Sequence, residues 1–268
     1  MTRLPSLYIT HGGGPCFWME FGPPFGPHAF EKLRGYLAGL IDSLPVRPKA
    51  ILVASAHWEE SRPTVSTAAK PGMLFDYSGF PPHTYKLNYP APGSPELAQH
   101  VRDLLKTAQI DSGTDNARGF DHGVFVPQLI IDPKAEIPVV MLSLQENLDP
   151  AAHIAIGKAL APLRDEGVLI IGSGSSYHNL RDFFSGDGRA SVAFDNWLAE
   201  TATQADATQR NARLVAWEKA PNARACHPRE EHLIPLMVAA GAAEADIGRQ
   251  SFNDRIGAQA VSCFSFGG

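Results

Sequence analysis

The sequence predicts an α/β protein with a mostly parallel, doubly wound central sheet and helices on both faces of that sheet. Short apolar runs alternate along the chain with amphipathic segments of helical period, which is the pattern of consecutive β–α units. The runs are continuously apolar, as expected for parallel strands that are buried on both faces. Capping residues and prolines open several of the amphipathic segments.

The N-terminal part of the chain predicts two strands and one helix. The run SLYIT at 6–10 has the residue types of a strand, and KAILVASA at 49–56 predicts a second strand. The amphipathic stretch 27–44 predicts a helix that begins at Pro27, because proline is favoured in the first helical turn. We expect the proline-rich segment 60–93 to be an irregular excursion or an antiparallel hairpin.

The middle of the chain continues the alternation. A helix is predicted over 94–110, where Ser94 supplies the N-cap before Pro and Glu. The apolar run IPVVMLSL at 137–144 predicts the next strand. Asp149 then caps a helix predicted over 149–167.

The C-terminal part predicts a strand over 168–175 and helices over 190–206 and 228–241. The polar stretch 204–213 is typical of a solvated helix rather than a linker. Because no repeat or linker interrupts the pattern, we expect a single domain over 1–268.

The composition disfavours several classes of partner. A net charge of −5 and a pI near 6.0 leave no basic stripe to neutralise phosphates, so we expect no nucleic-acid partner. No run approaches the ~18 apolar residues of a membrane span, so we expect no membrane partner. Three widely spaced cysteines, Cys16, Cys226 and Cys263, form no disulfide framework, which favours a cytoplasmic protein. A homo-oligomer is left open.

Histidines follow three of the predicted strands. His11 precedes Gly-Gly-Gly-Pro, His57 follows the second strand, and His178 lies a few residues beyond the strand at 168–175. In open parallel sheets, ligands bind just beyond the carboxyl ends of the strands. We therefore expect these imidazoles to meet at one edge of the sheet. His122, in FDHGVFVP, lies at a similar break in regular structure.

His227 and His232 lie five residues apart in CHPREEHLIPL. On a regular helix that spacing turns the two side chains about 140° from one another, so they cannot both face one metal. We expect a helix to begin at Pro228, with His232 one turn inside it and Pro235 bending it. His232 is then the candidate ligand, and His227 lies at the rim or supports the ligands.

Acidic residues are scarce at the predicted strand ends, where Asp121 and Glu59 are the nearest. A site built chiefly from neutral imidazoles would leave the charge of a divalent metal largely uncompensated. Such a site favours an anionic, bidentate substrate.

Five blocks of sequence, in this order, resemble the class III extradiol ring-cleaving dioxygenases, the superfamily of the protocatechuate 4,5-dioxygenase catalytic subunit. The resemblance is strongest to the branch of 4,5-DOPA dioxygenase extradiol-like proteins. It covers essentially the whole chain, and its blocks are ITHGGGP, ILVASAHWE, FDHGVFVPQ, IIGSGSSYHNL and HPREEHLIPLMVAAGAA.

The resemblance implies one divalent metal per chain, held by His11, His57 and His232. It implies that His178 is the acid/base residue and a candidate fourth ligand. It also implies that His122 contacts bound oxygen or substrate.

One departure from the protocatechuate branch concerns the metal. That branch has a glutamate as its third ligand, whereas His232 stands at the corresponding position here. Fe(II) is expected for activity, and Zn(II) is readily accommodated by the same three imidazoles.

Several residues are expected to contact the substrate. Gly13 and Gly14 have no Cβ, so substrate can approach the backbone there. Tyr177, His227 and side chains from 73–90 are further candidates.

The resemblance implies that a catechol, DOPA-like or other, is cleaved with O2 to a muconic semialdehyde. Two alternatives stay open from the sequence. Three histidines and a water on zinc also suit a hydrolase, and a non-enzymatic binding protein could retain the same pocket.

Overall fold

A computed structural model describes residues 2–23, 25–184 and 186–268. One eight-stranded sheet runs through the molecule in the order β4-β3-β5-β2-β6-β1-β8-β7. In chain order its strands are β1 (Ser6–Thr10), β2 (Ala50–Glu60), β3 (Thr64–Ser66), β4 (Gly113–Asp115), β5 (Val139–Gln145), β6 (Val168–Gly174), β7 (Gly248–Ile256) and β8 (Gln259–Phe266).

Helices separate most of these strands along the chain. The longer ones in the described residues are α1 (Glu31–Ala38), α2 (Pro95–Thr107), α3 (His122–Ile131), α4 (Pro150–Leu160), α6 (Arg189–Ala202), α7 (Ala207–Val215) and α9 (Ile234–Ala242). Two helices have a single turn each. Along the chain, α5 (Leu180–Phe183) comes after β6, and α8 (Ala223–Cys226) comes before α9. No helix within the described ranges is both long and apolar enough to cross a membrane.

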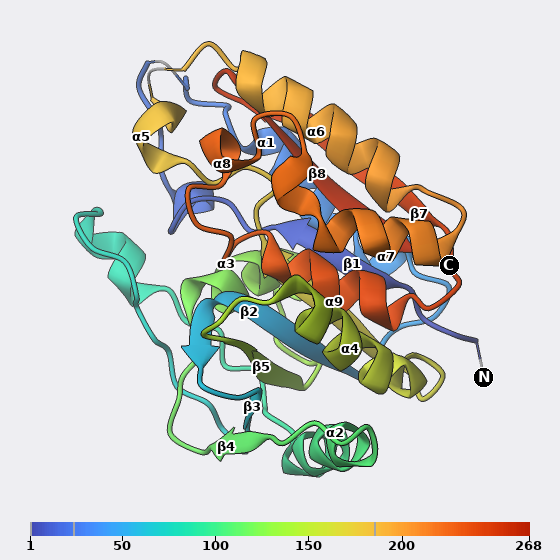
Figure 1. Cartoon of the computed structure of the whole chain (residues 1–268). Helices are drawn as coiled ribbons and strands as arrows, with labels where there is room; N and C mark the ends of the chain where they lie inside the picture. Colours follow the sequence, from blue (N-terminus) through green and yellow to red (C-terminus); the bar gives the residue numbers. More distant parts are fainter. Residues whose placement is uncertain (1, 24, 185) are drawn as a thin grey trace.

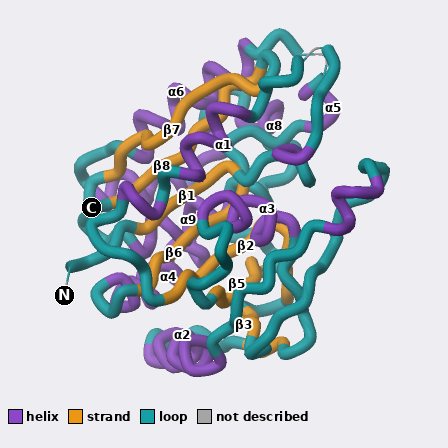
Figure 2. Tube along the Cα trace, turned by 180° about the vertical axis from the view of Figure 1, so that it is seen from behind, coloured by secondary structure: helices purple, strands orange, loops and turns teal. Residues whose placement is uncertain are grey.

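The four central strands β5, β2, β6 and β1 are parallel to one another, which confirms the predicted fold class. Helices α4, α6, α7 and α9 cover the face seen in Figure 1, and α1 and α3 cover the opposite face, seen in Figure 2. Residues of β2 alternate between two apolar clusters. Ile51 and Val53 pack in one cluster, and Leu52 and Ala54 pack in the other. Both faces of the strand are therefore buried, as its continuous apolar run predicts.

The antiparallel hairpin β7–β8 was not predicted. β8 pairs antiparallel with β1 and so extends the sheet beyond its parallel centre. The signal in β7 is weak because the strand is largely polar, with Arg249, Asn253 and Asp254 on a half-exposed edge. Edge strands of this kind lack the apolar run by which buried strands are recognised.

The predicted caps are confirmed, whereas several predicted helix boundaries are wrong, including the end of the helix expected over 149–167, which lies at Leu160. Ser94 and Asp149 accept hydrogen bonds from the backbone N–H groups of Leu97 and Ala152. The helix expected over 27–44 is shorter and runs from Glu31 to Ala38.

The helix expected from Pro228 begins only at Ile234. Pro235 therefore lies in its first turn, where its missing N–H costs nothing, and does not bend it. His232 consequently precedes the helix instead of lying one turn inside it. Between His227 and His232 the chain bends at Pro228 and Arg229 and enters a turn at Glu231.

The proline-rich segment 60–93 is an irregular excursion, as expected. It contributes the short strand β3 to the sheet and a 3-10 turn at Pro82–Lys86, and the part around this turn projects from the body of the molecule (Figure 2). An isolated bridge between Met73 and Phe120 ties it to the residues that precede α3.

Three strands deliver their carboxyl ends to the same edge of the sheet. Thr10 of β1 pairs with Gly174 of β6, and Ser55 of β2 pairs with Ser173 of β6. The residues that follow these pairs therefore emerge side by side, which is where α/β sheets bind ligands.

Close packing of α4 against α9 predicts a stability difference between two glycine variants. A Cβ on Gly157 would lie 2.1 Å from the carbonyl oxygen of Val238, whereas a Cβ on the exposed Gly35 of α1 would meet nothing within 4 Å. We expect Gly157→Ala to lower the free energy of unfolding by about 2 kcal/mol. Gly35→Ala should raise it by about 0.5–1 kcal/mol. Urea unfolding followed by circular dichroism measures both changes, and equal effects would contradict the packing described.

Candidate functional site

Three histidines from distant parts of the chain meet at this edge of the sheet. His11 directly follows β1, His57 lies where β2 shifts register against β5, and His232 lies two residues before α9. The Nε2 atom of His57 is 3.2 Å from the Nε2 atom of His11 and 3.2 Å from that of His232. Two nitrogens bound ~2.1 Å from one ion, about 90–110° apart, are separated by roughly 3.0–3.4 Å. These separations therefore fit three ligands of one divalent metal.

Contacts made by the Nδ1 atoms leave the Nε2 atom of each imidazole available to a metal. The Nδ1 atom of His11 is 3.1 Å from the Ser173 hydroxyl, which itself donates to the carbonyl oxygen of Gly123. That hydroxyl must therefore accept from Nδ1–H, which assigns the proton of His11 to Nδ1. The Nδ1 atom of His232 is 2.9 Å from Oε1 of Glu231. The Nδ1 atom of His57 lies 3.5 Å from a carboxylate oxygen of Asp76. Since all three residues make their contacts through Nδ1, the donor set suits a metal.

Burial keeps these imidazoles neutral. It lowers the pKa of His11 and of His232 well below the ordinary value, and the neighbouring imidazoles lower both further. Burial, followed by the effect of His122, also lowers the pKa of His57 to about 3. A neutral imidazole is the form that binds a metal, so the ligands need no deprotonation near neutral pH.

Asp76 joins His57 to His122. Its Oδ2 atom lies 3.5 Å from Nδ1 of His57, and its Oδ1 atom accepts from both the ring Nδ1 (2.8 Å) and the backbone N–H (2.9 Å) of His122. His122 is the first residue of α3, and its ring centroid is 3.9 Å from that of His57. Although burial raises the pKa of Asp76, its contacts with His122 outweigh that effect and lower it. The carboxylate thus stays ionised beside the candidate ligands.

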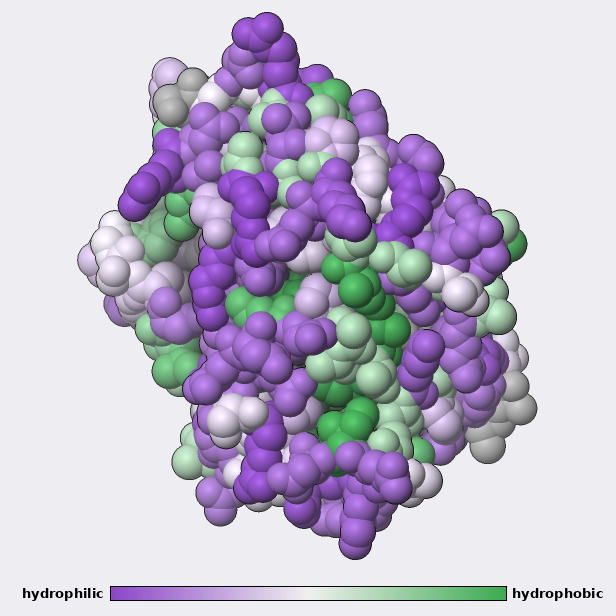
Figure 3. Space-filling model, viewed as in Figure 1, coloured by the Kyte–Doolittle hydropathy of each residue, from purple (hydrophilic) through white to green (hydrophobic). Residues whose placement is uncertain are grey.

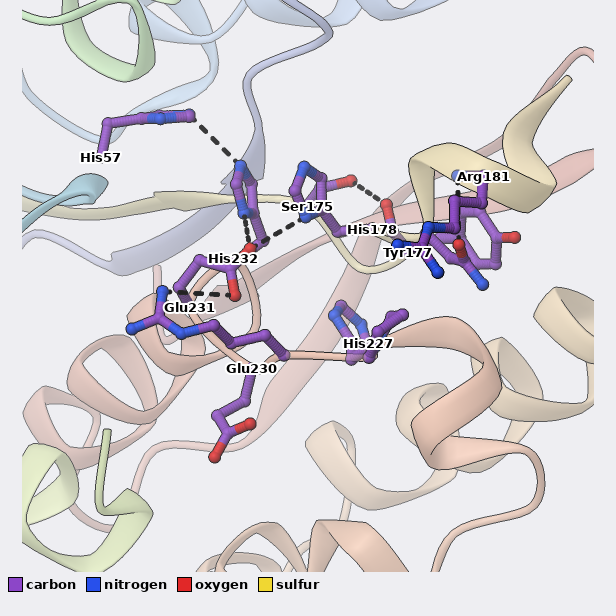
Figure 4. A network of polar contacts seen from close by, with 12 residues as sticks. His57, Ser175, Tyr177, His178, Arg181, His227, Glu230, Glu231 and His232 are labelled. Atoms are coloured by element: carbon purple, nitrogen blue, oxygen red, sulfur yellow. Dashed lines mark hydrogen bonds and ion pairs between the residues drawn. The ribbon is translucent and has the colours of Figure 1, made fainter. Parts of the chain in front are cut away.

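Glu231 links His232 to His178, as Asp76 links His57 to His122. Its Oε1 atom is 2.9 Å from Nδ1 of His232 and 3.0 Å from Nδ1 of His178, as Figure 4 shows. The rings of His178 and His232 stack, with centroids 3.4 Å apart. Burial raises the pKa of Glu231, but the hydrogen bond from His178 and nearby charges lower it overall. One carboxylate therefore orients two imidazoles.

The backbone of His232 is held as firmly as its ring. Its carbonyl oxygen accepts from the Tyr8 hydroxyl at 2.8 Å and from the Ser175 N–H at 3.0 Å. A Cβ on Gly174 would lie 2.0 Å from the same oxygen, so only glycine admits this approach. The close contact with β6 therefore places His232 without help from a helix.

A cavity of about 360 Å³ opens onto the histidines. Its lining includes Gly12, Gly13 and Gly14, of which the first and third have φ of +87° and +52°. A Cβ on Gly14 would lie 2.8 Å from the ring of Phe80, whereas one on Gly13 would meet nothing within 4 Å. The remaining lining is mostly aromatic and aliphatic. In Figure 3, most of the visible face is hydrophilic, with apolar residues gathered in a few recesses, one of them at the left edge.

Of the sequence-predicted site residues, the structure brings His11, His57, His122, His178, His232, Gly13, Gly14 and Tyr177 together around this cavity. His227 is an exception, because it is fully buried and does not line the cavity. Its Nε2 atom lies 3.0 Å from the Ser176 carbonyl oxygen, and its ring packs against Phe194 and Trp217. The rim position expected for it is therefore wrong, since the turn after α8 points it into the core.

Sequence reasoning missed the two carboxylates of the site. The two acids nearest to the predicted strand ends have other partners, since Asp121 accepts from Ser55 and Arg118, and Glu59 pairs with Arg229. Asp76 is the single acidic residue in 61–93, which was an available signal. For Glu231, the signal was its place next to His232. The expectation of a site without nearby compensating charge is wrong, because Asp76 and Glu231 contact four of its imidazoles.

Comparison with known proteins places this geometry in context. The family model described as the catalytic LigB subunit of aromatic ring-opening dioxygenase matches residues 7–264. A 4,5-DOPA dioxygenase extradiol from Beta vulgaris is 47% identical over 201 residues, which are 74% of this chain and 74% of that protein. One from Escherichia coli (strain K12) is 34% identical over 245 residues, covering 90% and 86% of the two chains.

A solved structure has the same overall arrangement. The crystal structure of an uncharacterized protein from Escherichia coli K12 matches with a TM-score of 0.77 at 30% sequence identity. The match covers 99% of this chain and 100% of that chain.

The burial of His227 predicts part of the acid sensitivity of the fold. Burial lowers the pKa of His227 to about 4, whereas an unfolded histidine titrates near pH 6.5. As the pH falls from about 6.5 towards 4, only the unfolded chain gains this proton, so stability is lost by roughly 1.4 kcal/mol per pH unit. His227→Gln should reduce the loss between pH 7 and pH 5, measured by urea unfolding. His28→Gln, at an exposed position, is the control, and an unchanged pH dependence in His227→Gln would contradict this account.

Proposed function

Because the chain belongs to the family of the catalytic LigB subunit of aromatic ring-opening dioxygenases, we propose that it cleaves a catechol with O2 to a muconic semialdehyde. The family membership confirms the resemblance read from the sequence, and the enzyme is an extradiol ring-opening dioxygenase. The observation that carries the proposal is the convergence of three Nε2 atoms at the end of an apolar cavity. Both atoms of O2 are retained in the ring-opened product, so the reaction needs no external reductant.

We propose that His11, His57 and His232 hold one divalent metal ion. Iron(II) is the metal that we expect in the active enzyme, and zinc(II) would bind the same three nitrogens. Bound iron(II) would supply a centre that holds the two catechol oxygens and O2 next to one another. Asp76 and Glu231 would support this centre, since each contacts the Nδ1 atom of a candidate ligand.

His178 is the candidate general base. Its Nδ1 atom faces Glu231, so its Nε2 atom is the one that remains to take a proton from a catechol hydroxyl. Its ring lines the cavity beside the ring of His232. With Glu231 accepting from Nδ1, the positive charge that His178 gains on protonation would be stabilised across a 3.0 Å contact.

His122 lies on the other side of His57 and lines the same cavity. Its Nδ1–H donates to Asp76, so Nε2 accepts a hydrogen bond in the neutral ring and would donate one towards negative charge on the substrate when the ring is protonated at both nitrogens. His178 and His122 would thus act on the ring from two sides of the metal ligands.

Replacement of a ligand and of the base should have separable effects. We expect His57→Ala to lose bound metal and, with it, O2 consumption, because one of three nitrogens is removed. His178→Gln should retain the metal while kcat falls by about 10²–10⁴-fold, because only the proton acceptor is lost. Metal analysis after anaerobic loading with iron(II), together with O2 uptake on catechol, measures both. Loss of metal in His178→Gln would instead make His178 a ligand, and turnover of an ester without O2 uptake would favour the hydrolase.

Asp76 should raise the affinity of the site for the metal without being a ligand itself. Asp76→Asn removes the charge that faces the Nδ1 atoms of His57 and His122, so we expect the affinity for the metal to fall by about 10–100-fold. Competition with a chelator measures that affinity. Asp254→Asn is the matched control, because Asp254 pairs with Lys32 and does not line the cavity. Equal affinities in the two variants would show that Asp76 does not support the centre.

A further inference from the structure

We infer that the catechol substrate carries an uncharged, apolar ring substituent rather than a carboxylate or an amino-acid group. The inference rests on the proposed function and deepens it by naming the substrate class. Three features of the cavity carry it, namely the residue types that line it, the hydrogen bonds of its hydroxyl groups and the character of its mouth.

The lining holds no charged partner for a substituent. Among the described residues that line the cavity there is no lysine, arginine, aspartate or glutamate. The imidazoles that line it belong to the candidate centre, where the two ring oxygens would be held. Beyond them the walls are aromatic and aliphatic, so a carboxylate on the substituent would lose water without gaining a cation.

Aromatic rings from three parts of the chain line the cavity. Phe25 packs against Phe183 and Phe184 of the α5 region, with ring centroids 5.5 and 5.2 Å apart. On the side of the excursion, Tyr77 packs against Phe80 with centroids 5.3 Å apart. All five rings line the cavity. An apolar substituent would therefore find van der Waals contacts on both sides.

The hydroxyl groups of the lining are already engaged within the protein. Tyr77 donates to the carbonyl oxygen of Thr84 at 2.8 Å, and Tyr177 donates to Asp182 at 2.9 Å. Thr10 and Ser175 donate to backbone carbonyl oxygens at 3.1 and 2.7 Å. Since each donor hydrogen is committed, these groups offer little recognition to a polar substituent.

The mouth of the cavity is apolar as well. Leu180 and Phe184 line it and are 61% and 64% exposed, an unusual fraction for large apolar side chains. Arg181 follows Leu180 but is not among the lining residues. Asp182, the next residue, is acidic and is not among the lining residues either. A chain that extends towards this mouth would gain by covering the exposed apolar surface.

A matched pair of substrates tests the inference. The iron-loaded enzyme is assayed with 4-propylcatechol and with 3-(3,4-dihydroxyphenyl)propanoate, which differ only in the group that ends the side chain, a methyl in the first and a carboxylate in the second. We expect kcat/KM to be at least about tenfold higher for 4-propylcatechol, and lower again for DOPA. Each methylene added from 4-methylcatechol to 4-propylcatechol should raise the affinity by up to about fourfold. Anaerobic titration of the protein's tryptophan fluorescence measures affinity independently of turnover.

Positive charge introduced at the mouth should weaken this preference. We expect Leu180→Lys and Phe184→Lys each to lower the ratio of kcat/KM between the two substrates by about fivefold or more. Leu180→Met controls for the change in side-chain shape. Val215→Lys is the surface control, because Val215 is 43% exposed and does not line the cavity. It should leave the ratio unchanged.

The outcomes separate this inference from the proposed function. Equal or faster cleavage of the carboxylated substrate, or of DOPA, would overturn the inference while leaving ring cleavage established. An unchanged ratio in both lysine variants would also overturn it. Failure of the iron-loaded enzyme to consume O2 with any of these catechols would contradict the proposed function itself, and the inference with it.

Discussion

The candidate centre depends on which nitrogen of each imidazole is left free. His11, His57 and His232 converge through Nε2 because an acceptor lies within 3.5 Å of each Nδ1 atom. The acceptor is Ser173 for His11, Asp76 for His57 and Glu231 for His232. Without such acceptors the tautomers and ring orientations would be free to vary, and the three lone pairs would not share one target. The sheet brings the residues near one another, but these acceptors turn proximity into a coordination geometry.

The same two carboxylates link the candidate ligands to the residues that would move protons. Asp76 contacts His57 and His122, and Glu231 contacts His232 and His178. Each acid thus couples one ligand to one cavity-facing imidazole. The arrangement also places negative charge behind the ligands, so the cavity itself can remain free of acidic side chains. An apolar substrate pocket and a centre for a cation are compatible for this reason.

Backbone packing sets the distance at which these groups meet. The approach of Gly174 to the carbonyl oxygen of His232 presses the turn before α9 against the end of β6. On the opposite side, the glycines after β1 let the chain turn sharply around His11, and Phe80 of the excursion packs against Gly14. The excursion therefore does two things, since it supplies Asp76 to the centre and aromatic rings to the cavity wall.

The sequence by itself determined the parallel core, the two caps at Ser94 and Asp149, and the histidines near the carboxyl ends of the strands. These features are local, because an apolar run, a cap or a strand-end residue is written in a few adjacent positions. Tertiary structure alone decided the partners of the histidines, the burial of His227, and the start of the last helix at Ile234. Asp76 lies 46 residues from His122 along the chain, and no local pattern states that such residues touch. The half-exposed strand β7 was not predicted for a related reason. Its pairing with β8, and not its own apolar character, makes it a strand.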